Sequence, residues 1–167
     1  MPMSMPRFLL LLGLALTAGC HGISYDSEHD PEVDFTQLHT FEFLAGPPEE
    51  QGVERDAVLL GILGEQLVAK GLQRASGQPD LLVAVHRSLE GVVHTKSSGY
   101  EVRNGRLSRY DLQEGTLVVD LVLAKTKKGV WRGTATGEYR FDSLPAERRE
   151  KLTEVMRELF ADFPPKR

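Results

Sequence analysis

Two ionisable side chains have the types that a general acid–base site would use, and each lies in a stretch that favours a β-strand. His86 lies in an alternating run, and Asp120 interrupts a later apolar run. An imidazole that is oriented by a carboxylate can accept and return a proton. A plainer interpretation is a cross-strand pair, with Asp120 opposite Thr134 and diagonal to Arg132, and with His86 at a half-exposed strand position. We expect the plainer interpretation to hold.

Other residue patterns that carry chemistry are weak in this sequence. It contains no Gly-rich phosphate loop, no GxSxG and no HExxH motif. His21 and His29 lie among acidic residues in a polar stretch, but their spacing matches no set of metal ligands, so a solvated linker is the better interpretation. We therefore expect no catalytic residue, no metal site and no cofactor, and a protein that is not an enzyme.

Cys20 is the only cysteine of the chain, and it directly follows an apolar run. Arg7 precedes the run Phe8–Leu16, and small residues separate that run from the cysteine. This is the layout of a secretory signal peptide. The run is too short to span a bilayer, which takes about 20 apolar residues. A single cysteine cannot form an internal disulfide, so its thiol needs another explanation.

The sequence Ala18-Gly19-Cys20 resembles the lipobox of bacterial lipoproteins. Thr17 stands where Leu is commoner in that signal. The resemblance implies that diacylglycerol is joined to the Cys20 thiol, that the peptide is cut before Cys20, and that the new amine receives a fatty acid such as palmitate. Several acyl chains form a stable membrane anchor, whereas one chain binds only marginally. The alternative is an ordinary signal peptide that leaves a free thiol.

The residue after the cysteine bears on localisation. Lipoproteins with Asp at this position tend to stay at the inner membrane, and His21 stands there in this chain. The resemblance therefore implies an outer-membrane lipid anchor, with the domain facing the periplasm of the cell envelope. The net charge of −4 is spread along the chain without a basic stripe. Nucleic-acid binding requires such a stripe, so we expect no nucleic-acid partner.

The order of patterns predicts a single α+β domain. Alternation predicts strands over 38–44 and 81–89, helical spacing predicts helices over 53–70 and 145–163, and a Gly-bearing turn predicts a hairpin over 115–141. We expect a mostly antiparallel sheet of about four strands, with two helices packed on one face.

The expected division of the chain has three parts. Residues 1–19 form the lipoprotein signal peptide, and 20–36 form the lipidated N-terminus and a tether, to which Ile23 and Tyr25 could add a short strand. Residues 37–165 form the α+β domain.

The two faces of the hairpin differ in character if Ala124 lies opposite Val130. One face then pairs bulky residues with small ones, which lets a helix approach closely: Leu117, Val119, Leu121, Leu123, Trp131, Gly133, Ala135 and Gly137. The other face mixes apolar and polar residues: Val118, Asp120, Val122, Val130, Arg132 and Thr134. Such a mixture is typical of a partner surface. Alternatively, a polar loop over 95–114 folds across it.

Three segments resemble a bacterial lipoprotein family of unknown function, domain of unknown function 4136. They are SYDSEHDPEVDFTQLHTFEFL, LVAKGLQRASGQPDLLVAV and GTLVVDLVLAKTKKGVWRGTATG. The resemblance covers residues 23–165. Leu123 departs from it, because relatives often carry Asp before the turn. The family has no established activity, so the resemblance implies no catalytic residues.

Two functions fit these observations. The first is a non-catalytic envelope lipoprotein that binds a protein or glycan partner. The second is a periplasmic carrier or sensor of a small apolar ligand held between sheet and helices. A cavity lined by Leu117, Val119, Phe160 and Phe163 would favour the second function, and a closed core would favour the first.

Overall fold

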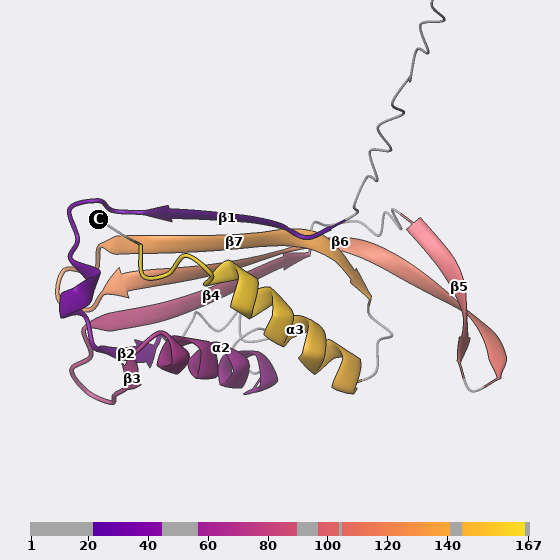
Figure 1. Ribbon diagram of the computed structural model, residues 1–167, viewed down its shortest axis with the longest axis horizontal. Helices are drawn as coiled ribbons and strands as arrows, with labels where there is room; N and C mark the ends of the chain where they lie inside the picture. The colour runs from indigo at the N-terminus through magenta and orange to yellow at the C-terminus, as the bar shows by residue number, and fades with distance from the viewer. Residues whose placement is uncertain (1–21, 45–56, 90–96, 104, 141–144, 166–167) are drawn as a thin grey trace, which may run out of the picture.

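A twisted β-sheet with two α-helices forms the described part of the chain (Figure 1). The computed structural model describes residues 22–44, 57–89, 97–103, 105–140 and 145–165. Six strands follow one another in the order β1-β7-β6-β4-β2-β3, and β5 pairs with β6 off this path. The elements are β1 (Ser24–His29), the short 3₁₀ helix η1 (Phe35–Gln37), β2 (Thr40–Phe43), α2 (Ala57–Ala69), β3 (Gln73–Arg74), β4 (Leu81–Leu89), β5 (Ser97–Arg103), β6 (Arg106–Leu123), β7 (Gly129–Arg140) and α3 (Pro145–Leu159).

The sheet is mixed, which corrects the expectation of a mostly antiparallel sheet with about four strands. β2 pairs in parallel with β4, where Phe41 lies opposite Leu81, and in parallel with β3. The helix α2 lies between β2 and β4 in the sequence. A chain that crosses back through a helix brings the next strand in parallel, whereas a tight turn gives an antiparallel pair. The α+β class itself is confirmed.

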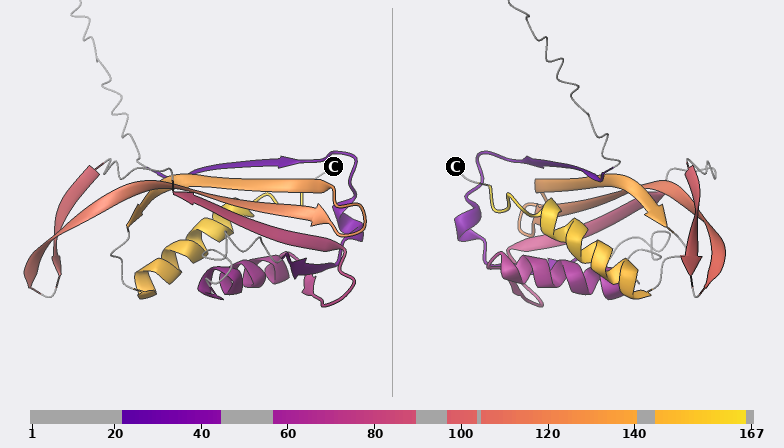
Figure 2. Two further views of the ribbon diagram at one scale, coloured as in Figure 1. Left: turned by 180° about the vertical axis from the view of Figure 1, so that it is seen from behind. Right: turned by 45° about the vertical axis from the view of Figure 1, so that its right-hand side comes forward.

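Both described helices pack on the same face of the sheet, which we call the inner face (Figure 2). The side chain of Leu159 in α3 lies against Gly133 of β7, where a Cβ atom would be only 3.0 Å from Leu159. Gly64 of α2 lies beside the Phe43 ring of β2. Gly133 pairs with Val119 in β6, and the absence of a side chain at Gly133 lets α3 approach the backbone.

Aromatic rings from α3 and from the segment that follows it fill the space above β7. The Trp131 ring stacks on Phe160 with ring centres 4.8 Å apart, and Phe163 meets both rings edge to face. Phe35 of η1 closes this cluster against Phe163. The apolar stripe predicted for the last helix is therefore buried, although the helix ends at Leu159.

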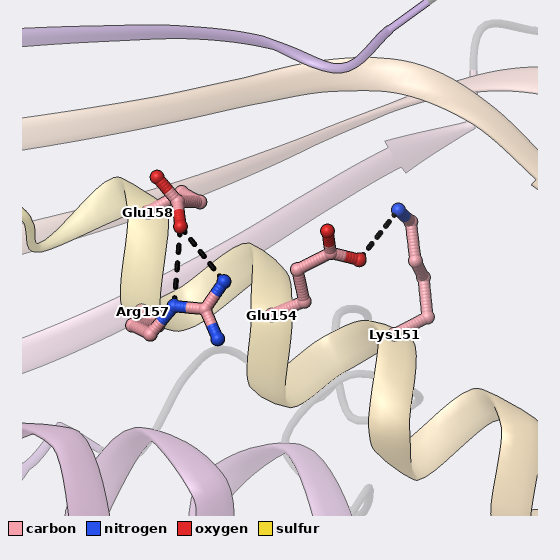
Figure 3. A network of polar contacts seen from close by, with 4 residues as sticks. All are labelled: Lys151, Glu154, Arg157 and Glu158. Carbon is pink, nitrogen blue, oxygen red and sulfur yellow. Dashed lines mark hydrogen bonds and ion pairs between the residues drawn. The ribbon is translucent and has the colours of Figure 1, made fainter.

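The outward surface of α3 is charged. Lys151 donates to Glu154 at 2.7 Å, and Arg157 donates to Glu158 at 2.9 Å (Figure 3). All four side chains are exposed. Exposed pairs of this kind contribute little to stability, because water and salt screen the charges and ordering two long side chains costs entropy. This surface of α3 is a solvated one.

The sheet begins inside the stretch that the sequence assigned to a tether. Residues 24–29 form β1, which pairs antiparallel with β7 so that Ser24 lies opposite Thr136. The pairing continues past the strand, because the Asp30 amide donates to the Val130 carbonyl at 2.9 Å. Tyr25 and its neighbours are exposed, as expected for a strand at the edge of a sheet.

The hairpin of β6 and β7 forms over the predicted residues, but its register differs from the prediction by two residues. Asp120 lies opposite Arg132 rather than Thr134. The turn closes tighter than predicted, because the Leu123 amide donates to the Lys128 carbonyl, and a bulge at Leu121/Val122 then sets the register of the remaining residues. A displacement by two residues keeps the side chains beyond the bulge on their predicted faces. Val130 is the exception, since it lies beside the bulge and is buried in the core instead of exposed.

Residues 97–112 form a hairpin rather than a loop folded over the sheet. β5 pairs antiparallel with the first residues of β6, from Ser97 opposite Leu112 to Arg103 opposite Arg106. Gly105 in the turn has φ of +74°, a conformation that favours glycine. The hairpin extends beyond the ends of both helices (Figure 1).

Candidate functional site

The candidate site is the face of the sheet opposite the helices, which we call the outer face. The predicted surface residues lie there on β6 and β7: Val118, Asp120, Val122, Arg132 and Thr134. Four of them are half-buried and Arg132 is exposed. The register adds β4, in which His86 lies opposite Val118 and Leu82 opposite Val122. The structure thus brings all five predicted positions together on one surface and places His86 beside them.

Asp120 and Arg132 form a bidentate ion pair at the centre of the outer face. Arg132 donates from Nε to Asp120 Oδ1 at 2.6 Å and from Nη2 to Oδ2 at 2.9 Å. The side chain of Asp120 is 14% exposed, whereas that of Arg132 is 59% exposed. The hydrogen bond from Arg132 to the Asp120 carboxylate raises the pKa of the guanidinium. The pair therefore presents a fixed, planar donor group toward solvent.

His86 lies near this pair. Its Nε2 atom is 3.8 Å from Asp120 Oδ2, which is longer than a hydrogen bond, and half of its side chain is exposed. Both oxygens of Asp120 already accept from Arg132. The carboxylate that could orient His86 is thus already hydrogen-bonded to Arg132. The sequence favoured a cross-strand pair of this kind, but with Asp120 diagonal to Arg132 rather than directly opposite it.

An open pocket of about 270 Å³ borders the ion pair at the end of β1. Its lining includes Glu28, Asp30, Asp120 and Arg132. Lys128 donates to Asp30 at 2.5 Å, and this hydrogen bond lowers the pKa of the Asp30 carboxyl. Two carboxylates of the pocket, those of Asp30 and Asp120, are therefore already partnered by cations. In the part of the chain that the structure describes, no group of His, Cys, Asp and Glu side chains could hold a metal ion.

Hydroxyl groups form a second polar row on the outer face, which the sequence analysis missed. Thr116 and Thr136 share a hydrogen bond of 3.1 Å between their hydroxyls, and Ser24 Oγ donates to the Thr136 carbonyl at 3.2 Å. The alternation of Thr134 and Thr136 with small inner-face residues is the signal that could have revealed this row. Threonine pairs across strands stabilise a sheet and leave polar groups at its surface.

The residues proposed for an internal ligand cavity are packed in the core. Leu117, Val119, Phe160 and Phe163 are all buried. Phe160 is covered by the stacked Trp131 ring. The four side chains thus contribute to one hydrophobic cluster with the helices.

Two further findings concern the membrane. Cys20, the predicted lipid attachment site, lies outside the described residues. None of the helices that the structure describes combines the length and apolar character needed to cross a bilayer.

Comparison with known proteins identifies a family. The family model described as "Domain of unknown function (DUF4136)" matches residues 25–165. No curated protein matches the chain.

Solved structures resemble the chain in fold. A PDZ domain protein from Parabacteroides distasonis aligns with a TM-score of 0.59 at 15% identity over 87% of this chain, which spans 36% of that protein's length. PelC from Paraburkholderia phytofirmans, solved as a dodecamer, has a TM-score of 0.48 at 9% identity, with coverage of 87% and 100% of the two chains. A minor lipoprotein from Acinetobacter baumannii has a TM-score of 0.40 at 14% identity, with coverage of 74% and 88%. At these identities the likeness concerns the fold alone.

Proposed function

The chain belongs to the DUF4136 family, and from this premise we propose that it is an envelope lipoprotein that binds a protein or glycan partner through the outer face of its sheet. In this proposal the domain is not an enzyme and needs no cofactor. It comprises residues 37–165, and the segment over 20–36 contributes the edge strand β1, which pairs with β7.

The anchor in this proposal is Cys20, and its support comes from the sequence. Ala18-Gly19-Cys20 follows an apolar run that has the layout of a signal peptide. Acylation uses the lone thiol, which would otherwise be a free cysteine in an oxidising compartment. His21 supports the outer membrane, and the domain then faces the periplasm.

The observation that carries the binding proposal is the composition of the outer face. Val118 and Val122 remain half-exposed at the centre of the sheet, and they flank the Asp120–Arg132 pair. Apolar positions around a fixed guanidinium are typical of binding surfaces, where Arg is enriched. Both described helices cover the inner face, so they leave these positions accessible.

The packing of the inner face weighs against the carrier function. A ligand between sheet and helices would have to displace Phe160 or Phe163, which are 0% and 5% exposed. Displacement of one such ring would cost about 3–5 kcal/mol in lost packing. The partner surface requires no such rearrangement.

Crosslinking in intact cells tests the binding proposal. We expect the double substitution Val118→Lys and Val122→Lys to abolish crosslinks to the partner, because two ammonium groups would prevent close apposition of the outer face. Each substitution at a half-exposed site should lower the free energy of unfolding by no more than about 1 kcal/mol.

Val68→Lys is the matched control. Val68 is 56% exposed on α2, away from the outer face, so its substitution should leave the crosslinks unchanged. Unchanged crosslinks in a folded double variant would show that another surface binds the partner. Loss of folding in the double variant would show that the face is buried in the functional protein.

A further inference from the structure

The hairpin formed by β5 and by residues 106–112 of β6, which we call the arm, exposes apolar side chains at its tip. Val102 and Leu107 lie opposite each other in the antiparallel register. They are 72% and 71% exposed, the highest values among the large apolar residues that the structure describes. Side chains directly opposite each other project from the same face of a hairpin, so these two form one apolar surface.

Positive charge flanks this apolar pair at the turn, on the next rung of the hairpin, where side chains point to the opposite face. Arg106 is exposed beside Leu107, and the register places Arg103 opposite Arg106 next to the turn. Residues 101–107 contain Glu101 and two arginines and so carry a net charge of +1, whereas the chain as a whole carries −4. Apolar residues next to Arg or Lys are typical of segments that enter the interface of an anionic membrane.

The arm leaves the sheet at the same end as the proposed anchor. Ser24, the first residue of β1, pairs with Thr136, and Thr136 pairs with Thr116 of β6. From Thr116, β6 runs toward the arm, while the chain from Ser24 runs back toward Cys20. Only three residues lie between Cys20 and Ser24, and the four steps along the chain span at most about 14 Å. A lipid anchor at Cys20 therefore holds the end of the sheet that bears the arm close to the membrane.

We propose that the arm docks on the anionic lipid surface of the membrane that holds Cys20, with Val102 and Leu107 in the interface and Arg106 among the phosphate headgroups. This inference rests on the proposed function, because the anchor is what keeps the arm near the lipid. An arm with two apolar residues binds weakly alone, and tethering raises its effective concentration at the surface. Docking would fix the orientation of the domain, so that the outer face is presented at a constant angle to the membrane.

A site-specific fluorescent reporter tests this inference on the full chain. Acylation occupies the thiol of Cys20, so a cysteine introduced by Leu107→Cys is the only free thiol available for an environment-sensitive dye. Lys125→Cys, in the exposed turn between β6 and β7, provides the matched control position. Each protein is reconstituted into phosphatidylglycerol-containing vesicles and into neutral phosphatidylcholine vesicles, both carrying a lipid-bound quencher. Mass spectrometry of the same samples reports whether Cys20 is acylated.

We expect the dye at position 107 to be blue-shifted and quenched in anionic vesicles, while the dye at position 125 is unaffected. Adding Val102→Asp or Arg106→Glu should reduce quenching at position 107 to the level of the control, whereas adding Val68→Asp should not. Equal quenching at positions 107 and 125, or at position 107 in both kinds of vesicle, would contradict docking of the arm on anionic lipid.

If the emission of the dye at position 107 is blue-shifted but not quenched by the lipid-bound quencher, the arm lies against protein rather than lipid. If the emission is neither shifted nor quenched, the arm lies in solvent. Either result overturns the inference. Absence of acylation in the mass spectrum would instead contradict the anchor, and with it the part of this inference that rests on the proposed function.

Discussion

Gly133 is the residue at which the sheet and the last helix come closest. A Cβ atom there would overlap the Trp131 ring and lie 3.0 Å from Leu159. We therefore expect Gly133→Ala to lower the free energy of unfolding by about 1–3 kcal/mol, as overpacking of a core does. Urea denaturation measures this change.

Gly61 offers the matched control for this prediction. It lies on the exposed side of α2, and a Cβ atom there would meet nothing within 4 Å. Gly61→Ala should therefore stabilise the protein by about 0.5–1 kcal/mol, because alanine favours a helix more than glycine does. An equal, small effect of both substitutions would show that α3 does not press on Gly133.

Asp80 joins the starts of the parallel strands β2 and β4. Its Oδ2 atom accepts hydrogen bonds from the amides of His39 and Thr40 and from the Thr40 hydroxyl, at 2.9, 3.0 and 2.8 Å. These bonds, first the one from the His39 amide, lower the pKa of the Asp80 carboxyl. Because the folded-state pKa is depressed, the stabilisation is present above the unfolded pKa of about 3.9 and is lost as pH falls through the folded pKa.

We expect Asp80→Ala to lower the free energy of unfolding at pH 7 by about 1–3 kcal/mol, since the donors on β2 lose their acceptor. The difference from the native protein should shrink as the pH falls below about 4. Urea denaturation from pH 7 to pH 3 follows both effects. A difference that does not vary with pH would indicate that the Asp80 charge plays no part in the strand junction.

At the scale of elements, α3 and the segment after it supply the aromatic half of the core. Phe160 is fully buried between Trp131 and Phe163. Phe160→Ala should lower the free energy of unfolding by about 3–5 kcal/mol, because the removed ring leaves a cavity that the rigid sheet cannot fill. Thermal denaturation monitored by circular dichroism measures the loss.

An exposed residue of α3 serves as the control for that measurement. Glu150 lies on the solvated side of α3, so Glu150→Ala should change stability by no more than about 0.5 kcal/mol. If Phe160→Ala melts at the temperature of the native protein, α3 is not packed as described.

At the scale of the whole molecule, the proposed function makes the position of the protein in the cell depend on one residue near its N-terminus. We expect mass spectrometry of the membrane fraction to find a mature chain that begins with an acylated Cys20. Thr17→Leu, which restores the commoner lipobox residue, should preserve this modification, whereas Cys20→Ser should abolish it. An unmodified terminus at another residue would contradict the anchor.

Local sequence patterns determined most elements of this protein. Apolar spacing located α3, alternation located β2 and β4, and two β-rich runs around a Gly-bearing turn located the hairpin of β6 and β7. The helix stop at Gly71 was also readable, because glycine adopts its φ of +94° and lets the Leu72 amide bond to the Leu67 carbonyl. These features depend on residues close together in the chain, so a short window contains the information that specifies them.

Only the tertiary structure decided how these elements meet. The alternation in β6 and β7 fits registers that differ by two residues equally well, and the bulge at Leu121/Val122 selected the one that pairs Asp120 with Arg132. The parallel junction at Asp80 and the pairing of β1 with β7 join segments far apart in the chain. The polar stretch of β1 lacks the apolar pattern of a strand, and it forms one because β7 offers its backbone groups as partners. Contacts of this kind depend on packing across the whole sheet, and no local window of the sequence specifies them.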